Sequence, residues 1–120
     1  MARAVHGAGL HPTLGLNHQG PTNPMCLVDD FMEPFRPFCD LAVHGLSDRG
    51  IAEVSIDAKR ALVNLTTIDI PGTRGVTTLF TAMSELVLSY VRVVEENSKS
   101  LAFATLPDNL SFAALFDDPA

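Results

Sequence analysis

Residues 10–37 read LHPTLGLNHQGPTNPMCLVDDFMEPFRP, and this stretch decides how the first half of the chain folds. Its first part has too many glycines, prolines and asparagines for a regular element, so we expect residues 9–24 to form a long ordered loop. Its second part begins a pattern of apolar residues three and four positions apart, which predicts a helix. A loop histidine, His18, therefore lies just ahead of carboxylates clustered on a helix.

The apolar pattern continues over residues 25–46 in spite of two prolines, Pro34 and Pro37. A proline inside a helix lacks the amide hydrogen and obstructs the carbonyl four residues earlier. We therefore expect the helix either to kink here or to end and restart with Pro34 in its first turn. In both cases the backbone is disturbed beside the acidic cluster.

Further helices are expected on both sides of this segment. Residues 2–8 read as the last two turns of a helix, with Gly9 as its C-terminal cap. Residues 56–66 have apolar side chains on one side and basic ones on the other, which predicts a short helix. Apolar residues keep helical spacing over residues 73–94 for about five turns, which predicts the core helix of the protein.

The remaining segments are irregular. Pro71 and Gly72 break the chain ahead of the core helix. Residues 101–106 are expected to be extended, and the tail at residues 109–120 either docks through its apolar side chains or frays. We therefore predict an all-α fold, with one mostly helical domain spanning residues 1–120.

The composition is that of a folded globular protein. The 120 residues are 47% apolar and 18% charged, whereas disordered chains combine low hydrophobicity with high charge. The net charge of −6, with only eight Lys and Arg, argues against a free-standing nucleic-acid binder, because affinity for the backbone comes from basic residues. If DNA is the substrate, cations or other segments must bring it in.

Two cysteines, Cys26 and Cys39, form neither a CxxC pair nor a zinc-binding spacing, so we expect buried, reduced thiols. No segment approaches the roughly 18 apolar residues of a membrane span. The first residues lack the apolar run of a signal peptide. A cytoplasmic protein that does not enter a membrane is the expectation.

Three carboxylates, those of Asp29, Asp30 and Glu33, are the main chemical candidates. On a helix Glu33 shares a face with one or both aspartates, because they are three and four residues apart. Such oxygens, with the His18 imidazole nearby, suit a hard divalent ion. The alternative is a solvated acidic turn that complements the helix dipole. His11, in the same loop, is a second candidate ligand, although we favour a structural role or one that supports the ligands.

One family shares the order and spacing of these residues. The chain has GLHPxLGLxH at residues 9–18, NP at 23–24 and LxDDFMEPFRP at 27–37. This pattern resembles the C-terminal helical domain of the CRISPR-associated endonuclease and integrase that inserts new spacers into CRISPR arrays, the Cas one family. The likeness is closest to the type II versions, those found with single-protein RNA-guided effector nucleases.

The resemblance implies a magnesium or manganese ion held by a glutamate, a histidine and an acidic residue, which promotes cleavage and strand transfer at phosphodiesters. It places His18 on the family's histidine and Glu33 on its acidic ligand. Asp30 matches a further acidic position that is a ligand in other branches. Arg36 lies within reach of the same surface, and either contacts phosphate or pairs with Asp40 four residues later.

The resemblance also implies what this chain lacks. Family members carry an N-terminal β-rich domain that forms the homodimer, and their first metal-binding glutamate lies on a helix that would precede Met1. We therefore expect a helical C-terminal lobe that binds metal weakly and is inactive alone. The implied partners are DNA (spacer precursor and CRISPR repeat), a second copy and a small ferredoxin-like CRISPR-associated protein. Two alternatives stay open: a non-catalytic, truncated helical interaction module, and an unrelated helical metal-binding protein.

Overall fold

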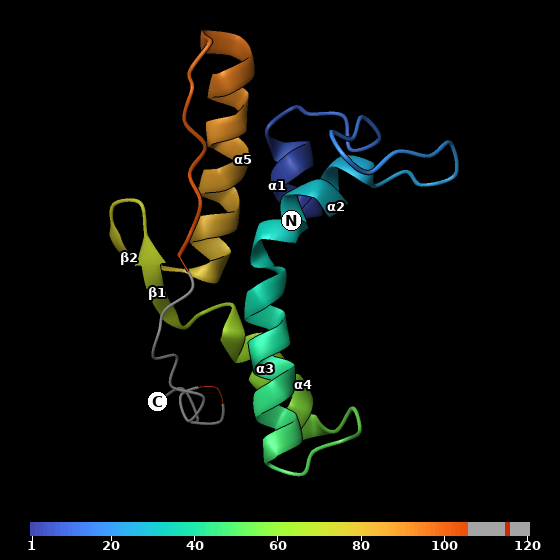
Figure 1. Ribbon diagram of the computed structural model, residues 1–120, viewed down its shortest axis with the longest axis vertical. Helices are drawn as coiled ribbons and strands as arrows, with labels where there is room; N and C mark the ends of the chain where they lie inside the picture. Colours follow the sequence, from blue (N-terminus) through green and yellow to red (C-terminus); the bar gives the residue numbers. More distant parts are fainter. Residues whose placement is uncertain (106–114, 116–120) are drawn as a thin grey trace.

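The computed structural model describes residues 1–105 and Leu115, and it is mostly helical (Figure 1). Its elements, in chain order, are α1 (Ala2–Gly7), α2 (Cys26–Met32), the 3-10 helix η1 (Glu33–Phe35), α3 (Arg36–Asp48), α4 (Ile56–Leu65), β1 (Asp69–Gly72), β2 (Gly75–Thr78) and α5 (Leu79–Glu96).

A glycine cap ends α1 and starts the long loop. The Gly9 amide donates to the His6 carbonyl (3.0 Å) and the Leu10 amide to the Val5 carbonyl (3.2 Å). This pair of bonds defines a Schellman motif. Gly9 has a φ of 76°, a conformation that other residues rarely adopt. The first predicted helix and its cap are confirmed.

Two prolines divide the helix predicted over residues 25–46. α2 ends at Met32, while Pro34 and Pro37 lie in the first two positions of η1 and α3. Proline fits there because the first amides of a helix have no partner within that helix. Of the two expected outcomes, the helix therefore ends and restarts, and Glu33 opens η1 at the junction.

The prediction of an all-α fold is wrong in one place. Strands β1 and β2 pair antiparallel, with Asp69 opposite Thr78 and Gly72 opposite Gly75, where the sequence suggested only a break at Pro71 and Gly72. Each strand has only four residues. Because proline and glycine disfavour strand interiors, they hide the signal for this hairpin.

The core helix begins later than predicted. α5 starts at Leu79, where the Thr78 hydroxyl accepts a hydrogen bond from the Thr81 amide (3.2 Å) and caps the helix. Residues 73–78 belong to the hairpin instead. Val76, which the helical spacing assigned to the apolar face, is 77% exposed on β2. Its fit to the helical spacing is coincidental.

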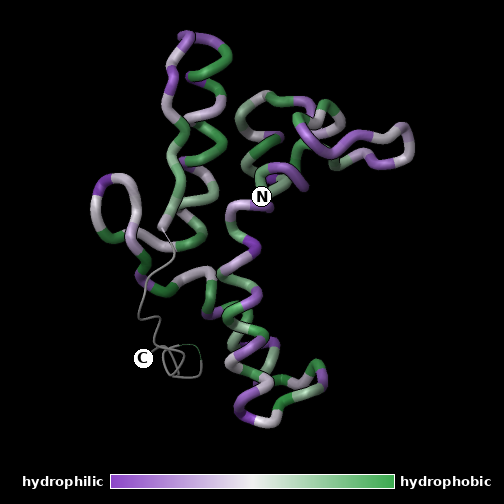
Figure 2. The backbone as a smooth tube through the Cα atoms, viewed as in Figure 1, coloured by the Kyte–Doolittle hydropathy of each residue, from purple (hydrophilic) through white to green (hydrophobic). Residues whose placement is uncertain are grey.

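One hydrophobic core joins the elements. α5 contacts α1 and α2, and α3 packs against α4 (Figure 1). Phe31 on α2 and Tyr90 on α5 meet edge to face, with ring centroids 5.2 Å apart. Figure 2 shows hydrophobic and hydrophilic residues alternating along α5, as expected for a helix with one buried face. The largest fully buried side chains are those of Phe35, Phe38, Ile70, Leu79, Leu86, Leu115, Val5, Val87 and Cys26.

After α5 the chain turns back and runs along that helix (Figure 1). We name residues 98–105 the return segment. The Ala102 amide donates to the Ser89 hydroxyl (3.0 Å), and the Thr105 amide donates to the Pro71 carbonyl (3.2 Å). The return segment is thus bound both to α5 and to the hairpin, and the segment predicted to be extended forms its second half.

The chain is open in shape. Its radius of gyration is 15.7 Å, against about 14 Å for a compact domain of this length, and α3 and α4 form an arm that extends away from α1, α2 and α5 (Figure 1). Of the tail at residues 109–120, only Leu115 is described; it is buried, and its carbonyl accepts from Asn64 Nδ2 (2.9 Å). The rest of the tail lies outside the described residues. None of the helices described is both long enough and apolar enough to cross a membrane.

Candidate functional site

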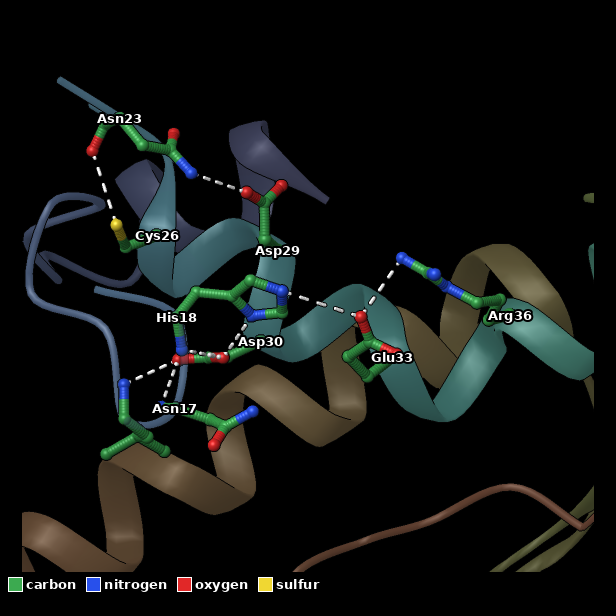
Figure 3. A network of polar contacts seen from close by, with 9 residues as sticks. Asn17, His18, Asn23, Cys26, Asp29, Asp30, Glu33 and Arg36 are labelled. Carbon is green, nitrogen blue, oxygen red and sulfur yellow. Dashed lines mark hydrogen bonds and ion pairs between the residues drawn. The ribbon is translucent and has the colours of Figure 1, made fainter. Parts of the chain in front are cut away.

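Asp30 holds the long loop at residues 9–24 onto α2. Its Oδ2 accepts hydrogen bonds from the amides of Leu16 (2.5 Å) and Asn17 (3.0 Å), and its Oδ1 accepts from the His18 amide (2.9 Å). Three successive amides therefore converge on one carboxylate (Figure 3). These hydrogen bonds place His18 next to Asp30, a helix residue twelve positions later in the chain.

Two further contacts fix the path of the loop. A Cβ on Gly15 would lie 1.9 Å from the His18 carbonyl oxygen and 2.8 Å from Cys26 Cβ, so a larger residue does not fit unless the backbone moves. Asn23 Nδ2 donates to Asp29 Oδ2 (2.8 Å), and Figure 3 shows Asp29 turned toward Asn23 rather than toward His18. Polar contacts with the carboxylates of α2 thus hold the predicted loop in place.

The His18 ring lies between two carboxylates. Its Nδ1 is 2.6 Å from Asp30 Oδ1, and its Nε2 is 3.7 Å from Glu33 Oε1 (Figure 3). In neutral imidazole one nitrogen donates and the other accepts, so the short contact with a carboxylate assigns the hydrogen to Nδ1. The Nε2 lone pair then faces Glu33. A histidine that binds a metal through Nε2 requires this tautomer.

The contact between His18 and Asp30 shifts the pKa of both groups. The hydrogen bond to Asp30 raises the pKa of His18 above its ordinary 6.5. For Asp30, burial by itself raises the pKa, but the hydrogen bonds from His18, Asn17 and Leu16 outweigh it and lower the pKa to about 2. The Asp30 side chain is only 7% exposed, so a buried negative charge lies next to Nδ1 of the imidazole.

An ion pair between Arg36 and Glu33 lies on the solvent-exposed side of the site. Arg36 Nη2 is 3.0 Å from Glu33 Oε1, the same oxygen that faces His18 Nε2. Glu33 is 41% and Arg36 64% exposed. Within the described part of the chain, Arg36 does not form the predicted ion pair with Asp40. Its other predicted role, contact with phosphate, stays a prediction.

The structure brings together His18, Asp30 and Glu33 and leaves other candidates apart. His11 is exposed, and Asp29 is bound to Asn23. In residues 1–105 and Leu115 there is no group of three or more His, Cys, Asp or Glu side chains placed to hold a metal ion. His18 Nε2 and Glu33 Oε1 are thus two donor atoms that face one another, while Asp30 faces the loop.

Sequence reasoning missed how the loop is anchored. Asn23 was recognised only as a residue that interrupts regular structure, yet its Oδ1 accepts from the Met25 amide (2.9 Å) while its Nδ2 binds Asp29. An asparagine ahead of a proline at the start of a helix signals this kind of turn. Both cysteines are free thiols, as expected, but only Cys26 is buried as predicted; Cys39 is half-buried.

These features define a helical domain in which a loop rich in glycine and proline presents a histidine to carboxylates on a helix. Residues 1–66, which include this whole site, match the family described as CRISPR associated protein Cas1. The CRISPR-associated endonuclease Cas1 of Neisseria meningitidis serogroup C (strain 8013) is 35% identical over 104 residues, which cover 84% of this chain and 34% of that protein. The chain belongs to the CRISPR associated protein Cas1 family. It spans about a third of the length of this relative. No solved structure matches it.

Proposed function

We propose that this chain supplies two ligands of a divalent-metal site in a DNA endonuclease and integrase that inserts new spacers into CRISPR arrays. The position of the His18 ring carries the proposal: Nδ1 is held by Asp30 at 2.6 Å, and Nε2 faces Glu33 Oε1 at 3.7 Å. Membership of the Cas1 family and the endonuclease name of the meningococcal relative support the type of reaction.

His18 and Glu33 are the residues that would hold Mg²⁺ or Mn²⁺. Carboxylate oxygen suits both ions, and an imidazole nitrogen is a common ligand for Mn²⁺ and similar transition metals. A divalent ion held by these two residues would supply Lewis-acid chemistry: it would polarise a phosphodiester and favour deprotonation of an attacking water or 3′-hydroxyl. With two protein ligands, this chain alone is expected to bind the ion weakly.

Asp30 acts in this proposal as a positioning residue, rather than as the possible further ligand that the family resemblance implied. Its two oxygens together accept the amides of Leu16, Asn17 and His18 and the His18 Nδ1 hydrogen. Both oxygens therefore face the loop. The imidazole contact also keeps the Nε2 lone pair directed toward Glu33, so that the two groups could share a cation.

Arg36 exchanges partners in this proposal. In the structure its guanidinium pairs with Glu33 at 3.0 Å. When a cation takes over the Glu33 carboxylate, the guanidinium becomes available to a phosphate oxygen of the substrate, which matches its planar set of donors.

The proposed substrate is DNA, both spacer precursor and CRISPR repeat, and the proposed partners are a second copy and a small ferredoxin-like CRISPR-associated protein. The net charge of −6 opposes approach of DNA to this chain. Tight binding of DNA is therefore expected to need divalent ions and basic surfaces of the partners, whereas the chain alone should bind DNA weakly.

Manganese binding tests the site directly. Titration of Mn²⁺ followed by electron paramagnetic resonance should show one weak site in the wild type and none in His18→Ala or Glu33→Ala. His11→Ala is the matched control, because this histidine is in the same loop but exposed. Unchanged Mn²⁺ binding in both site variants would contradict the ligand assignment.

Activity is tested in a chimera in which this chain replaces the aligned third of the meningococcal protein. The chimera should cleave branched DNA only with a divalent ion, and His18→Ala and Glu33→Ala should each lower the rate by about 100-fold or more. His11→Ala should leave the rate unchanged. Cleavage that survives both site substitutions would rule out this active site.

The second candidate function is a non-catalytic helical interaction module. The ion pair between Arg36 and Glu33 favours it, because the pair neutralises the carboxylate without a cation. This alternative predicts no manganese site in the wild type and an inactive chimera that still associates with intact copies.

A further inference from the structure

A second polar site lies across α5 from the His18 loop. Glu85, Leu88 and Arg92 are three, four and seven residues apart, so they share one face of α5. The Tyr90 ring contacts Phe31 on α2. Tyr90 is two residues from both Leu88 and Arg92, which is about 200° around the helix axis, so its side chain points away from theirs. Figure 1 shows the same separation, with the hairpin and the return segment on one side of α5 and α1 and α2 on the other.

A cavity of about 160 Å³ lies on this face of α5. Its walls come from α5, the tip of the hairpin and the return segment, and the residues lining it are Thr73, Arg74, Glu85, Leu88, Arg92 and Ala102. The volume is well above the roughly 30 Å³ of one liquid water. It therefore has room for a tetrahedral group of five heavy atoms such as a phosphate.

The hairpin tip that carries Thr73 and Arg74 is a tight turn with a glycine on either side of it. Gly75 has a φ of 110°, a conformation that favours glycine. A Cβ on Gly72 would lie 2.6 Å from Thr77 Cγ2, so the strands approach closely here. The two glycines thus allow the tight turn that places Thr73 and Arg74 at the cavity.

The opposite wall is fixed by the hydrogen bonds of the return segment. The Ser89 hydroxyl donates to the Leu86 carbonyl (2.7 Å) and accepts from the Ala102 amide (3.0 Å). The Thr105 amide donates to the Pro71 carbonyl (3.2 Å). The return segment is therefore hydrogen-bonded both to α5 and to the hairpin, and the cavity lies between these three parts of the fold.

Two arginines of this cavity have no acidic partner. Within residues 1–105 and Leu115, neither Arg74 nor Arg92 forms an ion pair, in contrast to Arg36, which pairs with Glu33. Glu85 lines the same cavity without pairing with either of them. The lining residues include two arginines and one glutamate, so together their side chains carry a net charge of about +1 at neutral pH.

We propose that this cavity binds one phosphodiester group of a DNA backbone. Two guanidinium groups and the Thr73 hydroxyl are phosphate donors, and the net charge matches the single negative charge of a diester. Leu88, 50% exposed, offers apolar surface to a sugar. The choice of DNA rests on the proposed function. Because α5 separates the two sites, the phosphate held here is a different one from that facing His18.

The test is an NMR titration of the ¹⁵N-labelled chain with a 12-base-pair DNA duplex in the presence of a metal chelator. The amides of Thr73, Gly75 and Ala102 should shift. The double variant Arg74→Gln/Arg92→Gln should bind about tenfold more weakly at low salt, and the slope of log affinity against log salt should fall by about 0.9, the loss of one phosphate contact. Glu85→Gln should tighten binding, because it removes the repelling carboxylate.

The matched control is Arg3→Gln/Lys59→Gln, which removes two exposed charges from α1 and α4. It should change the affinity less than twofold. Equal weakening in the two double variants, or a duplex that leaves the cavity amides unshifted, would overturn the proposal. Inorganic phosphate should shift these amides only at much higher concentration; a response as strong as that to the duplex would make this a general anion site and overturn the assignment to DNA.

This outcome is separate from that of the metal site. With the chelator present, the cavity amides should still shift when the duplex is added to His18→Ala/Glu33→Ala, which has lost the metal site. Loss of Mn²⁺ binding and loss of the cavity shifts are thus independent results, each of which rejects a different proposal.

Discussion

Asp30 accepts hydrogen bonds from both the backbone amide of His18 (2.9 Å) and its imidazole Nδ1 (2.6 Å), so one carboxylate fixes the loop and orients the ring. The glycines and prolines make the loop irregular, but these hydrogen bonds hold its backbone in place at His18. Changes at Asp30 should therefore alter both the stability of the protein and the titration of His18.

Asp30→Ala should lower the free energy of unfolding by about 2–3 kcal/mol, because it leaves three loop amides and the His18 ring without their acceptor. Urea unfolding followed by circular dichroism measures the change. Asp29→Ala is the matched control: Asp29 accepts one side-chain hydrogen bond, from Asn23, and its loss should cost less than about 1 kcal/mol. Equal costs at both positions would contradict the role assigned to Asp30.

Acid should weaken the folded state through Asp30. Its pKa in the folded protein, about 2, lies below its ordinary 3.8. A carboxyl group whose pKa is lowered by folding stabilises the protein above its ordinary pKa, and this contribution is lost as the pH falls through the folded pKa. The free energy of unfolding should therefore drop by about 2 kcal/mol between roughly pH 4 and pH 2. Asp30→Asn should remove this part of the acid sensitivity, and an unchanged profile would refute it.

His18 should titrate above its ordinary pKa of 6.5, because Asp30 accepts a hydrogen bond from its ring. A raised pKa stabilises the folded state below pH 6.5, and this contribution is lost as the pH rises through the folded value. NMR titration of the imidazole protons measures the pKa. Asp30→Asn should lower it toward 6.5, whereas Asp40→Asn should not; the same value in wild type and Asp30→Asn would disprove the coupling.

Gly15→Ala should distort the loop. The added Cβ would lie 1.9 Å from the His18 carbonyl oxygen, and relief of such a clash costs about 1–3 kcal/mol. Gly7→Ala adds the same methyl group to α1 with nothing within 4 Å, and should be neutral or slightly stabilising. Thermal unfolding of the two variants makes the comparison, with equal midpoints as the outcome that contradicts the loop packing.

Arg36→Gln should raise the affinity for Mn²⁺ several-fold. The guanidinium lies 3.0 Å from Glu33 Oε1, so it competes with a cation for that oxygen and repels the cation as well. Isothermal titration with Mn²⁺ compares the variant with Arg3→Gln, which removes an equal charge from α1. Weaker binding in Arg36→Gln would show instead that the guanidinium supports the site.

The loop and the proline junction were predictable because their signals are local. Gly9, Pro34 and Pro37 act through backbone conformation and missing amides, which neighbouring residues do not change. The hairpin was not predictable in the same way. Its strands carry Pro71, Gly72 and Gly75, which have a weak preference for the β conformation. The strands are stabilised instead by contacts distant in the sequence: they pair with each other, contact α5 and are hydrogen-bonded to the return segment.

The sequence by itself determined that a histidine would lie in an ordered loop ahead of helix carboxylates, and that Glu33 would share a helix face with an aspartate. Only the tertiary structure decided which carboxylate does what. Asp30 turns to the loop amides and His18 Nδ1, Asp29 turns to Asn23, and Glu33 faces His18 Nε2 and Arg36. Spacing along a helix fixes which face a side chain occupies. Which group each carboxylate binds depends instead on the path of the loop, which brings His18 to Asp30 across twelve residues of sequence.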